Sequence, residues 1–262
     1  MTVIMIGAIV AAMVTGDVAP AIKSRVQGTS INSSATWAPA EILSTSTSGS
    51  AWRPVTVVDS AGNVHVAWAD NSGLDGEGSD VDIYYKSWNM RTGQWSTIEV
   101  VSTGSTGDSD DPALCVDTVG NVHVAWEDNS DIAGSGIDYD IFYKVRDNVT
   151  GTWSATEVVS SESTAASEHP SIALDAAGNV HVVWDDLTNY GGHNDNQLDI
   201  FYKVRNSTTG AWNPVSIVTA DSTQYAAQPS ICIDNDNIIH MAYEDYGAPF
   251  FIGLAVEYLH CL

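Results

Sequence analysis

The chain has few basic residues, few cysteines and little helical periodicity. Its 262 residues include 9 Lys and Arg against 33 Asp and Glu, a formal net charge of −24. Nucleic acid and anionic membrane surfaces bind to basic faces, so this composition excludes both as partners. Cys115, Cys232 and Cys261 form an odd set that provides no disulfide framework. Residues 37–262 hold no apolar pattern of helical period, so we expect an all-β protein.

What the chain does contain is a repeat of about 58 residues. Asp59, Asp117, Asp175 and Asp234 lie 58, 58 and 59 residues apart, and similar residues surround each of them. Each copy has short runs of β-branched and aromatic residues, such as Asn121-Val-His-Val-Ala-Trp126, which are typical of strands. A unit of four antiparallel strands cannot bury both of its faces alone, so the copies must stack. The repeat therefore predicts a β-propeller of four-stranded antiparallel blades.

The turn residues support this fold independently. Three residues after each aspartate the hairpin needs a positive φ, and this position is filled by Gly62, Gly120, Gly178 and Asn237. Asparagine is the side chain best able to replace glycine there, because it tolerates the left-handed region. We therefore expect the same hairpin in all four copies.

Residues that recur in every copy are expected to be structural, because a catalytic site needs different groups that converge on one point. We expect the recurring strand histidines to form hydrogen bonds between blades; they are His65, His123, His181 and His240. The recurring tryptophans are expected in the core because large aromatic side chains dominate burial in such sheets. They are Trp37, Trp68, Trp95, Trp126, Trp153, Trp184 and Trp212.

The two ends of the chain are expected to complete one blade. Trp37 to Ser44 has the phase of a fourth strand, and the segment around Tyr258 has the phase of a third strand with no fourth after it. Pairing the two would close a ring of four blades and remove exposed sheet edges. The alternative is a fragment of a larger propeller, since the repeat is lost after Asp245.

The predicted organisation has three parts. Residues 1–21 are expected to be a signal peptide or an N-terminal anchor, because Val3 to Val14 is an apolar run followed by Ala19-Pro20-Ala21. Residues 22–36 are a linker, and residues 37–262 are the propeller, with repeats at about 37–94, 95–152, 153–211 and 212–262. We therefore expect a secreted or cell-surface protein.

The order of motifs within a blade resembles a known family. The copies combine a strand that ends in Asp-x-x-Gly-Asn, a strand that ends in Trp-x-Asp, a strand that reads Ile-Phe-Tyr-Lys, and a Thr-Gly-x-Trp-Ser turn. Over roughly residues 37 to 258 this looks like the blade of sialidase-type propellers with BNR (Asp-box) repeats. Arg205 to Trp212 lies where such a blade carries its Asp-box, but the box aspartate is absent. The resemblance implies the fold more strongly than the reaction, since a fold does not fix a function.

The family resemblance also implies a catalytic set: three arginines on the substrate carboxylate, a Tyr nucleophile with a Glu partner, and an Asp acid/base. Arg53 resembles the arginine of the Phe/Tyr-Arg-Ile-Pro motif of that family, with the isoleucine missing. Arg146 and Arg205 fall on third strands, away from the first-strand openings, so a three-arginine clamp is not supported. We therefore predict a binding or adhesion module for glycans or a surface protein; the alternative is a sialidase-like exo-glycosidase.

Non-repeating residues at the predicted mouth of the ring are the candidates for ligand binding. They are Trp52, Arg53, Asp111, His169, Tyr190 and Tyr225. Two interpretations of Trp52 and Arg53 stay open. Either they pack locally with Arg53 paired to carboxylates, or they form a small anion or sugar subsite with a flat indole and a forked guanidinium. The sequence does not indicate an oligomeric state.

The long loops make one face of the predicted ring strongly acidic. Ca²⁺ takes about six to eight oxygen ligands in flexible geometry, so these carboxylates are suited to binding it. The candidate ligands are Asp70, Asp80, Asp82, Asp128, Asp138, Asp140, Asp186 and Asp199. Two alternatives remain: general solvation of a secreted or salt-adapted protein, and a surface for a cationic partner.

Overall fold

The computed structural model describes residues 38–45, 49–74, 80–190, 197–219, 225–245 and 255–261. The chain divides into a unit of residues Met1–Glu41 and a unit of residues Ile42–Leu262. All regular elements among the described residues are β-strands. No helix in this part of the chain is long and apolar enough to cross a membrane. The expected signal peptide, linker and Trp37 fall outside the described residues.

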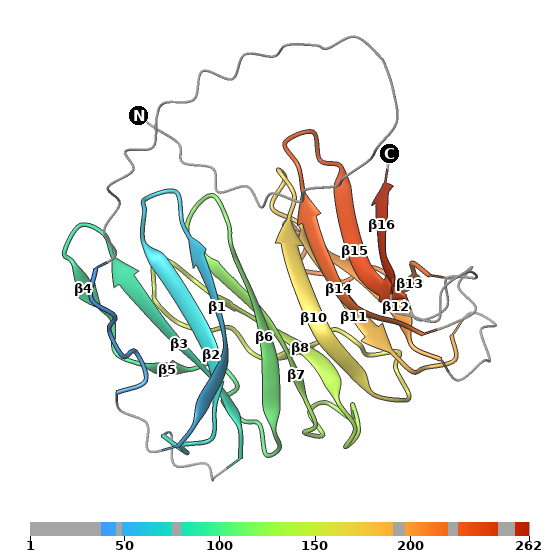
Figure 1. Cartoon of the computed structure of the whole chain (residues 1–262), viewed down its shortest axis with the longest axis horizontal. Helices are drawn as coiled ribbons and strands as arrows, with labels where there is room; N and C mark the ends of the chain where they lie inside the picture. The colour runs from blue at the N-terminus through green and yellow to red at the C-terminus, as the bar shows by residue number, and fades with distance from the viewer. Residues whose placement is uncertain are drawn as a thin grey trace. The chain divides into compact units, whose positions relative to one another are not determined.

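The strands form four antiparallel sheets, which we call blades one to four in chain order (Figure 1). Blade one comprises β1 (Ala51–Val58), β2 (Val64–Asp70), β3 (Asp82–Asn89), β4 (Gln94–Trp95) and β5 (Glu99–Val100). Blade two comprises β6 (Ser109–Val116), β7 (Val122–Asp128), β8 (Asp140–Arg146) and β9 (Glu157–Val158). Blade three comprises β10 (Ser167–Leu174), β11 (Val180–Asp186), β12 (Asp199–Arg205) and β13 (Ser216–Ile217). Blade four comprises β14 (Ala226–Ile233), β15 (Ile239–Asp245) and β16 (Ala255–Cys261).

The hairpin between the first two strands of each blade forms as the sequence predicts. Gly62 has φ 86° and Asn237 has φ 62°, so the asparagine keeps the left-handed conformation of the glycine that it replaces. The aspartate of the repeat stabilises the turn: Asp117 Oδ1 accepts the backbone amides of Val119 and Asn121 at 3.0 and 2.8 Å. Local turn chemistry therefore fixes the start of each second strand.

The apolar core lies between neighbouring blades, whose first strands pack side by side along the chain from β1 to β6, β10 and β14. The second-strand tryptophans are buried as predicted, with Trp126 and Trp184 each 1% exposed. One cluster joins Tyr143 of blade two to Trp184 and Phe201 of blade three. Burial of such large aromatic side chains supplies the main driving force for stacking.

Buried lysines link each blade to the one before it. Lys144 is 3% exposed, and its Nζ donates to the carbonyl of Val101 at 2.7 Å and to Thr103 Oγ1 at 2.8 Å. Lys203 repeats the contact one blade later, with Val159 O at 2.7 Å. The charge is buried with hydrogen-bond acceptors around it, which is the condition under which a buried cation is tolerated.

A second cluster between blades involves the two third-strand arginines. Arg146 donates through Nε and Nη2 to the two carboxylate oxygens of Glu99, both at 2.8 Å, and lies 5.5 Å from the ring centre of Tyr85. Trp153 Nε1 donates to the same Glu99 at 2.8 Å. The same set recurs one blade later as Arg205, Glu157, Tyr143 and Trp212. These arginines are therefore parts of the blade interfaces.

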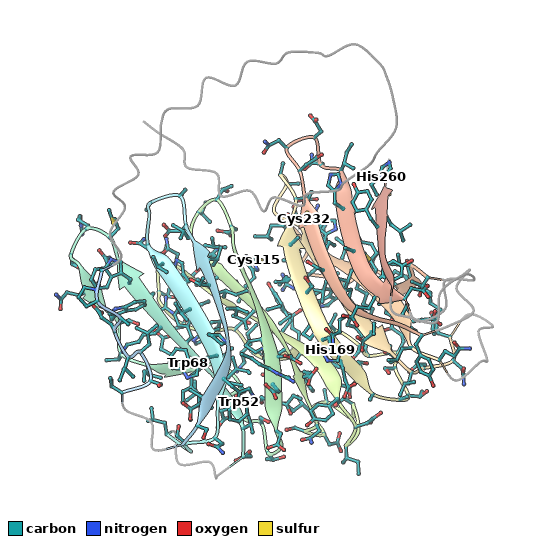
Figure 2. The ribbon with its side chains drawn as sticks, viewed as in Figure 1. Trp52, Trp68, Cys115, His169, Cys232 and His260 are labelled. Carbon is teal, nitrogen blue, oxygen red and sulfur yellow. The ribbon has the colours of Figure 1, made fainter. Side chains whose placement is uncertain are left out.

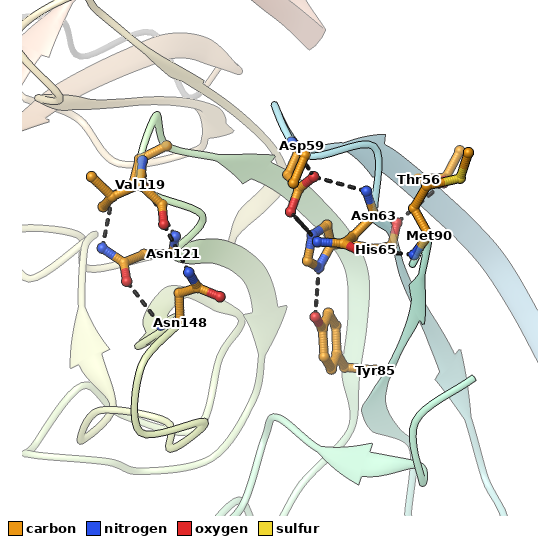
Figure 3. Close-up of polar contacts among 11 residues, drawn as sticks. Thr56, Asp59, Asn63, His65, Tyr85, Met90, Val119, Asn121 and Asn148 are labelled. Carbon is orange, nitrogen blue, oxygen red and sulfur yellow. Dashed lines mark hydrogen bonds and ion pairs between the residues drawn. The ribbon is translucent and has the colours of Figure 1, made fainter. Parts of the chain in front are cut away.

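The recurring histidines bond within their own blade, so the expectation of hydrogen bonds between blades is wrong. His65 Nδ1 lies 2.6 Å from Tyr85 Oη on β3, and His65 Nε2 lies 3.5 Å from Asp59 Oδ2 (Figure 3). Burial lowers the pKa of His65, so its neutral form is favoured, in which Nδ1 accepts from Tyr85 Oη and the N–H of Nε2 faces Asp59. The imidazole therefore bonds to a tyrosine on the adjacent strand of its own sheet and not to a neighbouring blade.

The two termini follow the predicted phase, but they are not seen to pair. β16 is the expected third strand, and Tyr258 Oη lies 2.6 Å from His240 Nδ1. Residues 38–45 form no strand and no pairing with β16 among the described residues. Leu43 instead packs on blade one, where its carbonyl accepts from Lys86 Nζ at 3.1 Å, as Val101 O accepts from Lys144.

Candidate functional site

Every first strand contains a β-bulge near its start. The pairing register with the second strand shifts at the same place in each copy, between Trp52 and Val55, Asp110 and Ala113, Glu168 and Ser171, and Ala227 and Ser230. A bulge bends its strand and re-aims a side chain, and bulges are frequent next to active sites. The proline of each repeat sits within the bulge, where no ladder hydrogen bond is needed.

The residue before each proline has a positive φ although it is not glycine. The values are 48° for Arg53, 46° for Asp111, 52° for His169 and 51° for Gln228. This conformation is uncommon for such residues, and it costs energy that the surrounding sheet must supply. Four different side chains are thus held in one shared backbone geometry.

These four residues and their prolines line a single cavity of about 310 Å³, which we call the axial cavity. Figure 2 shows His169 and Trp52 toward one end of the sheets, and Cys115 and Cys232 toward the other. The cavity is therefore formed where the first strands of all four blades begin. Its walls combine proline rings with one cation, one anion, one imidazole and one amide.

Carboxylates surround Arg53 at the axial cavity. Its Nη1 contacts Asp111 Oδ2 closely, lies 3.2 Å from Asp110 Oδ2, and lies 3.9 Å from Glu127 Oε1. The side chain is 45% exposed, so each pair is screened by water and contributes little stability. The carboxylates therefore mainly neutralise the positive charge of the Arg53 guanidinium.

His169 is fixed by contacts from two blades. Its Nδ1 lies 3.0 Å from Asp185 Oδ2, and this hydrogen bond with a buried carboxylate raises the pKa of His169 to about 9. Its backbone amide donates to Glu127 Oε2 at 2.8 Å. One blade further on, the amide of Gln228 donates to Asp185 Oδ2 at 2.7 Å. A carboxylate at the end of a second strand therefore caps the bulge of the next blade.

Two acids near the axial cavity have altered titration. Burial raises the pKa of Glu127 to about 7. Burial also raises the pKa of Asp111, although the nearby Arg53 opposes the effect. Perturbed acids in a hollow are typical of functional sites, although structural charge networks also perturb pKa values.

The six predicted ligand-binding residues separate into two groups. Arg53, Asp111 and His169 meet at the axial cavity. Trp52 lies in a separate hollow of about 220 Å³, with its Nε1 donating to Asp110 Oδ1 at 3.0 Å. Tyr190 packs edge-on against Phe201, with ring centres 6.2 Å apart, and Tyr225 is exposed; neither lines the cavity.

Six of the eight predicted calcium ligands lie opposite one another across strands. Asp70 lies opposite Asp82, Asp128 opposite Asp140, and Asp186 opposite Asp199. Protein groups donate to several of them: Ser109 Oγ donates to Asp128 at 2.6 Å, and Ser160 Oγ donates to Asp140 at 2.7 Å. Two buried oxygens of the set, Asp70 Oδ1 and Asp140 Oδ2, have no hydrogen-bond partner among the described residues, so these bonds satisfy only part of it. Asp80 and Asp138 are partly buried, and a calcium site formed by these eight residues stays a prediction.

Glu127 and Asp185 were not among the residues predicted to bind a ligand. Both follow the tryptophan of a second strand, at a position that reads Ala69, Glu127, Asp185 and Glu244 in the four copies. The next residue is aspartate in every copy. A varying residue between two recurring positions of the repeat was therefore the sequence feature that could have indicated Glu127 and Asp185. Only the stacking of blades shows that the varying position faces the bulge of the following blade.

No protein-family model and no curated protein matches this chain. Several solved structures do. A protein of unknown function from Dyadobacter fermentans shares 11% identity at TM-score 0.57, over 80% of this chain and 66% of that one. An intramolecular trans-sialidase from Ruminococcus gnavus, in complex with oseltamivir carboxylate, shares 9% at 0.55, over 81% and 68%. A GH93 α-L-arabinofuranosidase of Fusarium graminearum, in complex with arabinobiose, shares 13% at 0.53, over 80% and 62%.

At these identities the similarity shows the fold alone: the chain has a sialidase-like β-propeller fold. It spans about two thirds of the length of these proteins. The propeller predicted from the repeat is confirmed, and no match to a BNR repeat family accompanies it.

Proposed function

We propose that the axial cavity binds a glycan, and that the chain acts as a carbohydrate-binding module of a secreted or surface-exposed protein. One observation carries this proposal: four β-bulges hold four unlike polar side chains around one cavity. Folding alone does not require four different side chains at backbone positions that cost energy to maintain.

The chemistry of the cavity suits the hydroxyl groups of a sugar. Arg53 and His169 donate hydrogen bonds, Asp111 accepts them, and the amide of Gln228 does both. Each sugar hydroxyl also donates and accepts, so a ring that bridges these groups leaves none of them unpaired. The volume of about 310 Å³ is at the small end of ligand sites, which fits one or two sugar units.

The structural neighbours support the ligand class. The trans-sialidase was solved with oseltamivir carboxylate and the arabinofuranosidase with arabinobiose, so propellers of this kind hold carbohydrates and their analogues. At 9% and 13% identity this support does not extend to individual residues.

Neutral glycans are favoured over acidic ones. Asp110 and Asp111 already neutralise Arg53, so a sugar carboxylate would have to displace them. Binding is also favoured over sialidase-type hydrolysis. Of the described arginines only Arg53 lines the cavity, while Arg146 and Arg205 are held in blade interfaces.

A glycan array followed by calorimetry on the best ligand tests this function. Gln228→Ala and Asp111→Asn should each weaken binding about ten-fold or more, because a lost hydrogen bond to a buried or charged partner costs roughly 1.5–3 kcal/mol. Arg91→Ala, in an exposed turn of blade one, should leave the affinity unchanged. No binding on the array, or equal affinity in all variants, would contradict the proposal and favour a surface protein as partner. Turnover of a fluorogenic sialoside would favour the glycosidase.

The proposal includes a ring of four blades closed by the two ends of the chain. Its support is that Leu43 already takes the place of a preceding fourth strand beside blade one, and that β16 lacks a fourth strand among the described residues. The alternative is an arc of a larger propeller, completed by further blades.

A further inference from the structure

Three side chains at the rim of the axial cavity lie within reach of a single ion. They are Glu168, His169 and Asp185, and one ligand atom from each lies within 4.8 Å of the others. Glu168 and Asp185 are direct partners across β10 and β11, and the bulge at His169 turns the imidazole to the same side. Among the described residues this is the one such set.

We propose that Glu168, His169 and Asp185 bind a divalent transition-metal ion of the Zn²⁺ type. One imidazole nitrogen with two carboxylates is a donor set that Zn²⁺ accepts, whereas a site for Ca²⁺ would consist of oxygen atoms alone. Three protein ligands leave a fourth position for water or for a ligand in the axial cavity, which His169 also lines. This site does not rest on the glycan proposal.

An unsatisfied buried atom points to the same ion independently. The Asp185 side chain is fully buried, and its Oδ1 has no hydrogen-bond partner among the described residues. A buried carboxylate oxygen without a partner costs roughly 1–3 kcal/mol or more. The other oxygen, Oδ2, is already used by the amide of Gln228 and by His169. A bound ion would satisfy Oδ1 and account for the burial of this charge.

The charges around the set also favour a cation. Asp111 Oδ2 lies 3.8 Å from His169 Nε2, and Glu127 Oε2 accepts the amide of His169. The imidazole would coordinate in its neutral form, so an ion on Asp185 Oδ1 competes with the proton that His169 Nδ1 shares with Asp185 Oδ2. Arg53 is the one lysine or arginine that lines the axial cavity, and it is paired with Asp110 and Asp111.

The set occurs in one blade only. The equivalent triplets are Trp52, Arg53 and Ala69 in blade one, Asp110, Asp111 and Glu127 in blade two, and Ala227, Gln228 and Glu244 in blade four. At the bulge position, histidine is present only in blade three, while the bulge itself is the same in all four blades. The fold therefore needs the bulge but not the ligand set, as expected of a specific site.

Calorimetric titration of Zn²⁺ into the tag-free full chain, stripped with EDTA and without glycan, tests the site. We expect saturable binding of one ion per chain. Glu168→Gln and His169→Gln should each weaken it about ten-fold or more, in line with the usual cost of disturbing a metal site. Glu168 is partly exposed, so its variant should fold normally; circular dichroism and melting in EDTA check this for both.

His240→Gln is the matched control. His240 Nε2 lies 3.0 Å from Asp234 Oδ2, so it repeats the His–Asp contact without belonging to a set of three ligands among the described residues. Absence of saturable Zn²⁺ binding, equal affinity in His169→Gln, or an equal loss in His240→Gln would overturn the site. Glycan binding that survives in EDTA would keep the two proposals separate, and Ca²⁺ titrated in parallel reports on the repeated aspartates.

Discussion

At the scale of single residues, one position of the repeat can carry the same side chain with the same contact in three copies, while another position differs in every copy. His65, His123 and His181 each hold a tyrosine of the adjacent strand at 2.6 Å and are buried to the same extent. The bulge position instead carries Arg53, Asp111, His169 and Gln228. Identical contacts indicate a role in folding, and the different side chains in one geometry are the observation on which the proposed glycan site rests.

The buried histidines give a prediction about pH. Burial lowers the pKa of His123 below its ordinary value of 6.5, so on acidification the unfolded chain takes up the proton first. The stability that neutral His123 contributes is therefore present above about pH 6.5 and is lost as the pH falls below it. His123→Gln can still bond Tyr143 but cannot be protonated, and should cost roughly 1 kcal/mol near neutral pH.

The measurement is the difference in melting temperature between the parent and His123→Gln at several pH values from about 7.5 to about 5, a range that spans the ordinary histidine pKa. This difference should shrink as the pH falls, because only the parent loses the contribution of His123. The comparison removes the opposite effects of Glu127 and His169, whose pKa values are raised and which are unchanged in both proteins. A constant difference would show that His123 does not titrate as its burial implies.

At the scale of elements, each blade is held to the previous one by a few buried polar contacts within a large apolar interface. The third strand of one blade supplies a lysine, and the carbonyl at the end of the preceding fourth strand accepts from it. In blade four, Leu259 stands where the other blades have Lys86, Lys144 and Lys203. The interface between blades three and four therefore lacks the lysine contact of the two preceding interfaces.

Lys144→Met tests the contribution of the buried lysine. Methionine fills a similar volume but leaves the buried carbonyl of Val101 without this donor, so the free energy of unfolding should fall by roughly 1–3 kcal/mol. Chemical denaturation measures it. Lys86→Met is the control: Lys86 is less buried and donates to the partly exposed Leu43, so its loss should be smaller. Equal effects would mean that burial does not set the strength of this contact.

At the scale of the whole molecule, blade four ends in an apolar hollow. Tyr202, Val218, Leu259 and Cys261 line this hollow of about 360 Å³ beside β16. In the preceding interfaces the equivalent tyrosines, Tyr85 and Tyr143, meet a tryptophan of the next blade edge-on. Completion of blade four by a further strand would fill the hollow in the same way.

Deletion of residues 22–45 tests whether the ends of the chain close the ring. Leu43→Ala is the matched control, since it removes only the packing of one side chain on Val66, Trp68 and Tyr84. Leu43 is partly buried, so that packing should contribute less than the roughly 1.5–3 kcal/mol of a fully buried leucine. If the segment also pairs with β16, the deletion exposes a sheet edge and should lower the melting temperature well beyond the effect of Leu43→Ala. A deletion no more costly than the point substitution would contradict closure.

The structure of a single blade could be predicted from the sequence. Alternation of apolar residues, the turn glycines and the Asn237 replacement are local properties, because the pleat and the allowed φ values act within a few residues. For the same reason the buried tryptophans, the third strand around Tyr258 and the phase of Leu43 could be predicted from the repeat.

Which residues of different blades meet is visible only in the folded molecule. Arg53, Asp111, His169 and Gln228 are about 58 residues apart in sequence, and the bulges and the stacking of blades bring them to one cavity. The fold also places Tyr85, rather than a neighbouring blade, against His65, and it brings Glu127 and Asp185 to the next bulge. These outcomes depend on twist, bulge geometry and packing between distant segments, which residue spacing alone does not encode.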